Sequence, residues 1–190
     1  MSIAKIQDDS KGFTLLELMV AVAVFVFVVL IGTGAFLTVL NAQRKASSLR
    51  VAQDNIRFTM EYMTKEIRMG TLYTCGGTEG VLGPQDCDFG SGKNYLTFRN
   101  DDGAVVVYKL SGGSSGRLQK SVGGSTYYVS SSESDLTFKS LTFYVTGTGN
   151  GAADQEQPKV TITAEVEADA GKTKSTFNLQ TTVSQRSLDS

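Results

Sequence analysis

The chain has 190 residues, a formal net charge of −1, no histidine and two cysteines. Without histidine the chain lacks the commonest general base and most zinc sites, and the near-neutral charge gives no support for direct nucleic-acid binding through phosphates. With 20 glycines and 2 prolines the composition suits many turns between β-strands, and the length suits one domain with a helical anchor.

Residues 1–12 form a polar leader, and residues 13–40 form a nearly uninterrupted apolar stretch in which Glu17 is the only charged residue. At ~1.5 Å per residue, a helix over 13–40 would be roughly 42 Å long, longer than the ~30 Å hydrocarbon core of a bilayer. The stretch is therefore predicted to be a single transmembrane helix. A cleaved secretory signal is a poorer interpretation, because its apolar region would be shorter and would end at a small-residue cleavage site.

The residues Lys11-Gly12-Phe13-Thr14-Leu15-Leu16-Glu17-Leu18 resemble the processing site of type IV prepilins and of the pseudopilins of type II secretion. The resemblance implies a prepilin peptidase and methyltransferase that cuts between Gly12 and Phe13 and methylates the new Phe13 amine. It also implies a bacterial inner-membrane protein in contact with lipid, with a cytoplasmic N-terminus and an extracytoplasmic head. Such a protein would join other pilin or pseudopilin subunits in a filament with the help of an assembly platform membrane protein.

Glu17 has two compatible interpretations. Thr14-Leu15-Leu16-Glu17 fits a capping box, and a carboxylate in the first turn complements the helix dipole, which contributes ~1 kcal/mol. In the functional interpretation, Glu17 pairs with the positively charged Phe13 amine of the same or a neighbouring subunit. That pair neutralises two groups that are costly in lipid and fixes the register of docking subunits.

Gly32 and Gly34 interrupt the helical pattern of the apolar stretch. Each glycine costs ~1 kcal/mol relative to alanine in a water-exposed helix. Two interpretations stay open: local melting on assembly, or close packing between helices through small residues.

Residues 41–70 are predicted to continue the same helix in amphipathic form, because apolar residues recur at spacings of three and four. Glu61 and Lys65 are predicted to form an i,i+4 ion pair, and Gly70 is predicted to cap the helix. The predicted apolar stripe consists of Leu49, Ala52, Ile56, Met60, Met63 and Ile67.

Residues 71–190 are predicted to form a β-rich globular head, which gives an α+β fold: a long helix whose second half packs on an antiparallel β-sheet. Two alternating runs flank Asn100-Asp101-Asp102-Gly103, which is a strong hairpin signal. The predicted strands are Tyr95–Arg99, Ala104–Leu110, Arg117–Val122, Ser125–Ser130, Leu136–Val145, Val160–Ala168 and Thr173–Gln185.

Cys75 and Cys87 are predicted to form a structural disulfide, since an oxidising compartment favours one and no other cysteine or histidine could complete a metal site. No cofactor is expected. Calcium is a weaker hypothesis for Asp86, Asp88, Asp101 and Asp102, because turn chemistry alone explains carboxylates of this kind.

No catalytic residues are nominated, and the chain is not expected to be an enzyme. The strand Leu141-Thr142-Phe143-Tyr144-Val145 and the tail from Phe177 to Arg186 resemble minor subunits of the PulJ/PilW type. The predicted function is a structural subunit, and a minor one, of a type IV pilus or a type II secretion pseudopilus. The alternative is a monomeric, single-pass anchored binding module that uses the pilin-like segment only for export.

Overall fold

The computed structural model describes residues 12–113, 115–130, 136–149, 156–169 and 174–186. Of the predicted leader, only Gly12 is among the described residues. The chain divides into two compact units, Met1–Arg44 and Lys45–Ser190.

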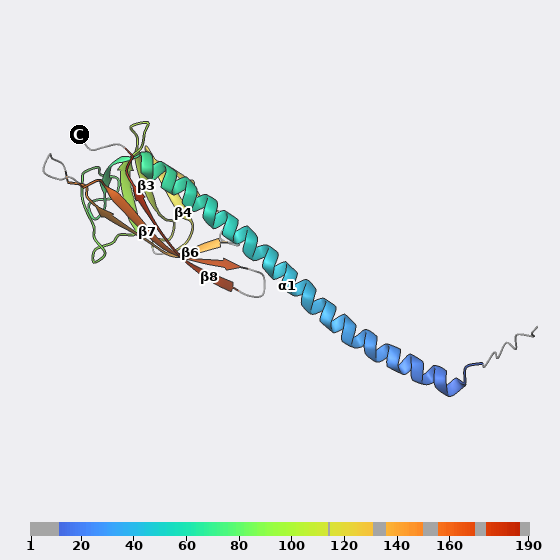
Figure 1. The fold of residues 1–190 in the computed structure, drawn as a ribbon. Coiled ribbons are helices and arrows are strands. Elements are labelled where there is room, and N and C mark those ends of the chain that lie inside the picture. The colour runs from blue at the N-terminus through green and yellow to red at the C-terminus, as the bar shows by residue number, and fades with distance from the viewer. Residues whose placement is uncertain (1–11, 114, 131–135, 150–155, 170–173, 187–190) are drawn as a thin grey trace, which may run out of the picture. The chain divides into compact units, whose positions relative to one another are not determined.

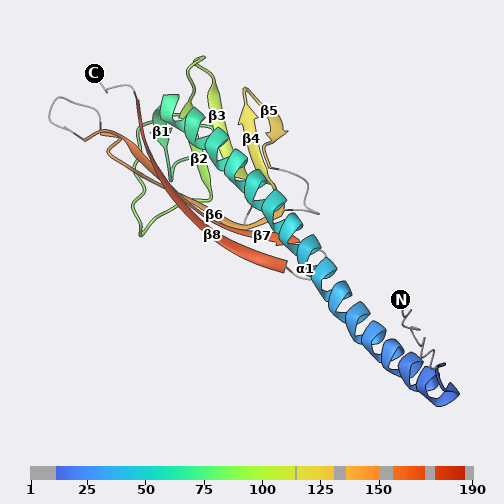
Figure 2. The same ribbon diagram turned by 45° about the vertical axis from the view of Figure 1, so that its right-hand side comes forward.

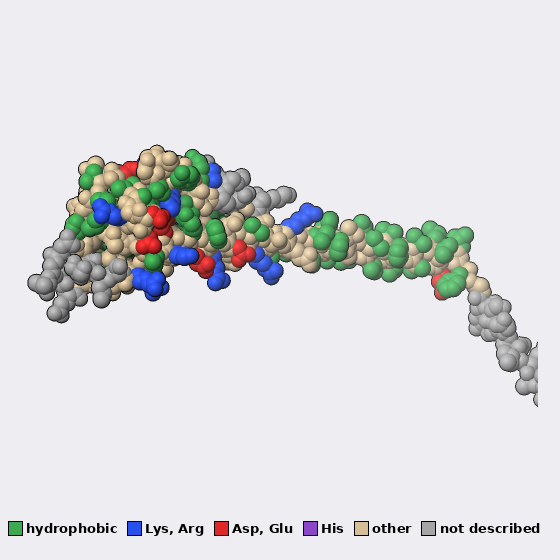
Figure 3. Space-filling view, turned by 90° about the horizontal axis from the view of Figure 1, so that it is seen from above, with side chains coloured by type: hydrophobic (Ala, Val, Ile, Leu, Met, Phe, Trp, Pro, Cys, Tyr) green, Lys and Arg blue, Asp and Glu red, His purple; other side chains and the backbone are tan. Residues whose placement is uncertain are grey.

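Helix α1 runs Leu15–Met69 and continues through Gly32 and Gly34 without a break (Figure 1). In the first unit, every described residue up to Val39 is exposed. Hydrophobic side chains line this part of the helix in the space-filling view (Figure 3). By length and composition, α1 can cross a membrane.

The β-strands of the second unit form two antiparallel sheets within the described residues (Figures 1 and 2). One sheet has the order β1-β2-β3-β4-β5 and the other the order β6-β7-β8. The strands are β1 (Thr71–Thr74), β2 (Tyr95–Arg99), β3 (Val105–Leu110), β4 (Leu118–Val122), β5 (Ser125–Tyr128), β6 (Leu136–Thr146), β7 (Lys159–Asp169) and β8 (Lys174–Ser184).

The α+β fold predicted from the sequence is confirmed, and all the predicted strands are found with small shifts at their ends. The predicted hairpin between β2 and β3 is also present: Asn100 donates its backbone N–H to the Ala104 carbonyl at 2.9 Å. Gly103 follows the two aspartates with a φ of 81°, a conformation that favours glycine. The division into two sheets is a feature that the alternating pattern did not indicate.

Strand β1 was not predicted, and its geometry explains why. It is short, its pairing with β2 shifts register between Thr71 and Thr74, and Leu72 has a φ of 55°. Gly70 follows the helix as predicted, but close packing explains the glycine. A Cβ on Gly70 would lie 2.4 Å from Cδ2 of Phe98, so a larger residue would displace that ring.

The buried face of the second half of α1 and both sheets share one apolar core. The predicted helix stripe supplies the buried Ala52, Ile56, Met63 and Ile67, whereas Leu49 and Met60 are half-buried. Each large side chain that is fully buried contributes about 1.5–3 kcal/mol through the hydrophobic effect. The bulkiest fully buried side chains are Tyr73, Phe98, Tyr108, Phe138 and Phe143.

The predicted ion pair between Glu61 and Lys65 is not the one that the structure shows. Glu61 instead pairs with Arg57, one turn earlier, with 2.8 Å between Nε and Oε1. Both side chains are largely exposed, so the exchange of partner has little effect on stability.

Candidate functional site

The predicted cleavage site lies directly before α1. Phe13 is 82% exposed, and nothing lies within 4 Å of the position that a Cβ on Gly12 would occupy. The peptide bond between Gly12 and Phe13 is therefore open to a protease, and the helix that follows would remain intact after cleavage.

Thr14 caps the first turn of α1. The backbone N–H of Glu17 donates to the Thr14 hydroxyl oxygen at 3.2 Å, and the N–H of Leu18 donates to the Thr14 carbonyl at 3.1 Å. The Glu17 N–H is a donor that the start of a helix would otherwise leave unpaired, and the Leu18 bond is the first hydrogen bond of the helix itself. The cap fixes where the helix begins and so places Glu17 in the first turn, near the Phe13 amine that cleavage would release.

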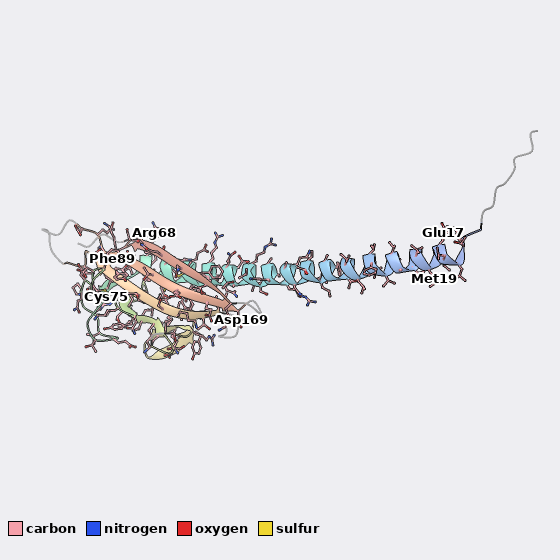
Figure 4. The ribbon with its side chains drawn as sticks, turned by 90° about the horizontal axis from the view of Figure 1, so that it is seen from below. Glu17, Met19, Arg68, Cys75, Phe89 and Asp169 are labelled. Carbon is pink, nitrogen blue, oxygen red and sulfur yellow. A yellow bond between two sulfur atoms is a disulfide. The ribbon has the colours of Figure 1, made fainter. Side chains whose placement is uncertain are left out.

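The Glu17 carboxylate is exposed at the start of an apolar helix (Figure 4), and it has no hydrogen-bond or ion-pair partner among the described residues. The hydroxyls of Thr33 and Thr38, in contrast, donate to the carbonyls four residues earlier at 2.8 and 3.0 Å. These two threonines are thus compatible with lipid, which offers no partner for polar groups. Glu17 is the polar side chain in this stretch that still needs a partner.

Gly32 and Gly34 are helical, and nothing lies within 4 Å of the position of a Cβ on either one. The backbone at both positions is therefore open on the side where a neighbouring helix could approach. Local melting on assembly remains the other interpretation.

A disulfide joins Cys75 and Cys87, which are 0% and 2% exposed, with their Cα atoms 5.5 Å apart. Cys87 also forms a pair of backbone hydrogen bonds with Val145 on β6, each 2.9 Å long. The disulfide therefore connects the end of β1, in one sheet, to a segment that covers the edge of β6 in the other. Its role is structural.

Two of the four aspartates considered for calcium, Asp86 and Asp88, hold loops through hydrogen bonds. Asp86 accepts hydrogen bonds from the backbone N–H groups of Gly147 and Thr148 and from the Thr148 hydroxyl, at 3.1, 2.9 and 2.7 Å. Asp88 accepts from Gly90 and Ser91 within its own turn. Within the described part of the chain, no three acidic or cysteine side chains are grouped in a way that could hold a metal ion.

A polar network between α1 and the larger sheet was missed by the sequence analysis. Glu66 forms an ion pair with Lys120 of β4 at 2.6 Å and accepts a hydrogen bond from the Tyr108 hydroxyl of β3. Lys120 also donates to the Tyr62 hydroxyl at 3.1 Å. A lysine in the middle of a strand, between Gln119 and Ser121, was the available signal, but nothing in the pattern indicated that it faces the helix.

Two pKa values in this network are shifted. Burial raises the pKa of Tyr108 above its ordinary value of 10.0, and the hydrogen bond to Glu66 raises it further. For Lys120 burial lowers the pKa, but the hydrogen bonds to Glu66 and Tyr62 outweigh it and leave the pKa above 10.5. The network is thus a neutral tyrosine and a charged pair that fix α1 to the sheet.

Residues 8–33 match the family model described as the prokaryotic N-terminal methylation motif. Comparisons with curated proteins and with solved structures give no match. The motif and the long apolar helix support a type IV pilin-like prepilin segment at the N-terminus, of the kind that pilin- and pseudopilin-like proteins carry.

The motif implies processing by prepilin peptidase and assembly with other pilin subunits, and with the apolar helix it fits an inner-membrane anchor. The family that carries the motif is structural and not catalytic. The resemblance of the head to minor subunits of the PulJ/PilW type stays a prediction, because the matched residues end before the head begins.

Proposed function

We propose that this protein is a filament subunit, and a minor one, of a type IV pilus or a type II secretion pseudopilus. Prepilin peptidase cuts between Gly12 and Phe13 and methylates the Phe13 amine. The mature chain stays in the inner membrane by α1, with the head on the extracytoplasmic side, and then enters the filament through the same helix.

One observation carries this proposal: Glu17 is an exposed carboxylate without a described partner in the first turn of an otherwise apolar helix. A lone charge on a membrane-spanning helix is costly, up to about 3 kcal/mol on insertion scales when it lies at the bilayer centre. A carboxylate in such a position is therefore a candidate for a functional partner. The Phe13 amine of an adjoining subunit supplies the opposite charge, and pairing with it sets the axial position of one subunit against the next.

The decisive experiment removes the charge of Glu17 and leaves in place the cap that its backbone N–H forms with Thr14. Glutamine is also accepted in a capping box, so Glu17→Gln keeps the cap and removes the charge. We expect the variant to be processed and inserted but to enter filaments at least about tenfold less well, because removing one partner of a buried pair costs about 3–5 kcal/mol. The measurement is the ratio of subunit in sheared filaments to subunit in membranes.

Glu17→Asp, which keeps the charge, serves as the matched control and should retain part of the incorporation. Mass spectrometry of the native protein tests the processing step, with methylated Phe13 expected as the first residue. Intact Met1 in the membrane, with unchanged behaviour of Glu17→Gln, would instead favour the anchored binding module.

A further inference from the structure

Strand β8 is an open sheet edge in the described structure. It has 11 residues, pairs with β7 in an unbroken register and has no strand on its other side. A long, regular edge presents a row of backbone donors and acceptors to which another strand can bind. Lys174, at its first position, is the only charged side chain on the strand.

The other edges of the two sheets are covered or short. The edge of β6 is bridged by Cys87, Lys93 and Gly116, and that of β1 is bridged by Gln85. Strand β5 has only 4 residues. Because such edges are usually protected against unwanted pairing, the open edge of β8 calls for an explanation by function.

Two hydrogen bonds show which backbone groups of β8 face outward. Directly after the strand, Gln185 donates to the Pro158 carbonyl on the β7 side at 3.0 Å, and Arg186 donates to the Arg68 carbonyl on the opposite side at 2.9 Å. Backbone groups of successive residues in an antiparallel strand point to alternate sides. The groups at the open edge therefore belong to Thr176, Asn178, Gln180, Thr182 and Ser184.

Helix α1 forms a second wall beside the end of this edge. A groove of about 540 Å³ lies between Glu61, Thr64, Lys65 and Arg68 of the helix and residues Thr181, Thr182, Val183 and Ser184 of β8. Figure 4 shows Arg68 near the end of the outermost strand of this sheet. An edge strand with a helix alongside it is the arrangement in which peptide-binding domains accept an extended segment as an additional strand.

The charges around the groove favour an acidic occupant. Lys65, Arg68 and Arg186 are exposed, and no acidic partner pairs with any of them among the described residues. The one carboxylate in the groove, that of Glu61, is already paired with Arg57. An incoming strand with acidic side chains would therefore meet unpaired cations.

A symmetric pair of two copies does not suit this edge. The second half of α1 and strand β8 run in the same direction (Figure 2). Near their ends, Arg186, two residues after β8, donates its backbone N–H to the Arg68 carbonyl. Pairing β8 with β8 about a two-fold axis would reverse one helix relative to the other, whereas subunits of one filament share a direction. The occupant is therefore a different segment of the adjoining chain.

We propose that the edge of β8, together with the groove beside α1, binds an extended acidic segment of an adjoining filament subunit as a fourth strand of this sheet. This inference rests on the proposed function, because the filament supplies the neighbour. It assigns to the head a contact of its own, separate from that of Glu17.

The test is photo-crosslinking of the full-length protein in cells that assemble the filament. A photoreactive benzoylphenylalanine replaces Thr64 in the groove, and the matched control carries it in place of Phe58, which is exposed on the same helix outside the groove. We expect Thr64 to give a crosslink to an acidic segment of another subunit with a prepilin-type N-terminus. Phe58 should not give this crosslink.

Two further variants test the strand pairing. Gln180→Pro removes one outward N–H, whereas Gln180→Thr changes the side chain and keeps the N–H. We expect Gln180→Pro to reduce the crosslink at least about tenfold and Gln180→Thr to leave it unchanged, with the same thermal unfolding of the head in both.

The inference is wrong if Thr64 crosslinks only to its own chain or to lipid, if it gives no crosslink, or if both Gln180 variants behave alike. The N-terminus of the same samples is read by mass spectrometry. Methylated Phe13 and normal filaments without the crosslink would overturn this inference alone, whereas a retained leader would overturn the proposed function.

Discussion

The two halves of helix α1 belong to one continuous element but differ in what their side chains require. Up to Val39 the described residues are exposed, and the helix is apolar on all sides. From Ala52 onward one stripe of the helix is buried in the core of the second unit. A helix that is apolar all around needs lipid or other helices, whereas a striped helix is satisfied by its own domain. The second half is thus part of the folded domain, whereas the first half leaves its side chains for lipid or other helices, as the proposed role in assembly requires.

The difference between the two halves of α1 can be tested by shortening one side chain in each half. Met63 is fully buried, so Met63→Ala should lower the free energy of unfolding of the head by about 3–4 kcal/mol. Leu37 is 54% exposed, so Leu37→Ala should leave that free energy unchanged. Chemical denaturation of the full-length protein in detergent measures both. A similar loss in the two variants would show that the first half also supports the head.

Removal of the disulfide should have the next largest effect, again confined to the second unit. Replacing both Cys75 and Cys87 by serine should cost about 3 kcal/mol, because the unfolded chain regains the freedom that a loop of this length loses. Denaturant midpoints of the oxidised, reduced and double-serine proteins provide the measurement. Equal midpoints would argue against a stabilising role.

Alkaline pH should loosen the second half of α1 from the larger sheet. Tyr108 and Lys120 have folded pKa values above 10.0 and 10.5, so both keep their protons longer when folded. The stability that they contribute is complete below pH 10 and is lost as the pH rises further. For Tyr108 alone the slope is about 1.4 kcal/mol per pH unit.

Tyr108→Phe removes that titration, so its unfolding free energy should fall less between pH 10 and 11 than that of the unmodified protein. Tyr127 is 57% exposed, and Tyr127→Phe is the control expected to keep the original slope. Two identical pH profiles for Tyr108→Phe and the unmodified protein would exclude this role of the network.

The smallest effect is expected at the start of α1. Thr14→Ala removes the hydroxyl that accepts from the Glu17 N–H and should destabilise the first turn by ~1 kcal/mol, without any change in the head. Hydrogen exchange of the amides of residues 15–18, in detergent, reports the loss of protection. Unchanged exchange would mean that the turn is held by other contacts.

The sequence predicted those parts of the fold that are set by local pattern. Apolar and polar residues alternate on both sides of Asn100-Asp101-Asp102-Gly103. This pattern was sufficient to predict the hairpin of β2 and β3, because the turn residues and the two strands are adjacent in the sequence. Strand β1 and the division into two sheets depend on distant contacts, such as the bridge between Cys87 and Val145, which no local window contains.

At the candidate site, too, only residues within one local motif could be predicted from the sequence. Gly12, Phe13 and Glu17 were identified because they belong to one short motif, and their roles in processing and assembly stay predictions. The pairing of Glu66 with Lys120 joins residues from a helix and a strand, and it depends on which face of the strand meets the helix. The sequence showed two ordinary surface charges at these positions.

The covered edge of β6 has a consequence for when, relative to export, the head completes its folding. Its bridge at Cys87 is held by a bond to Cys75 that forms only in an oxidising compartment. In the reducing cytoplasm that bond is absent, and the covering segment lacks its attachment to β1. If the head is extracytoplasmic as proposed, export precedes the closing of this bond, and the edge of β6 gains its full cover only on the oxidising side of the membrane.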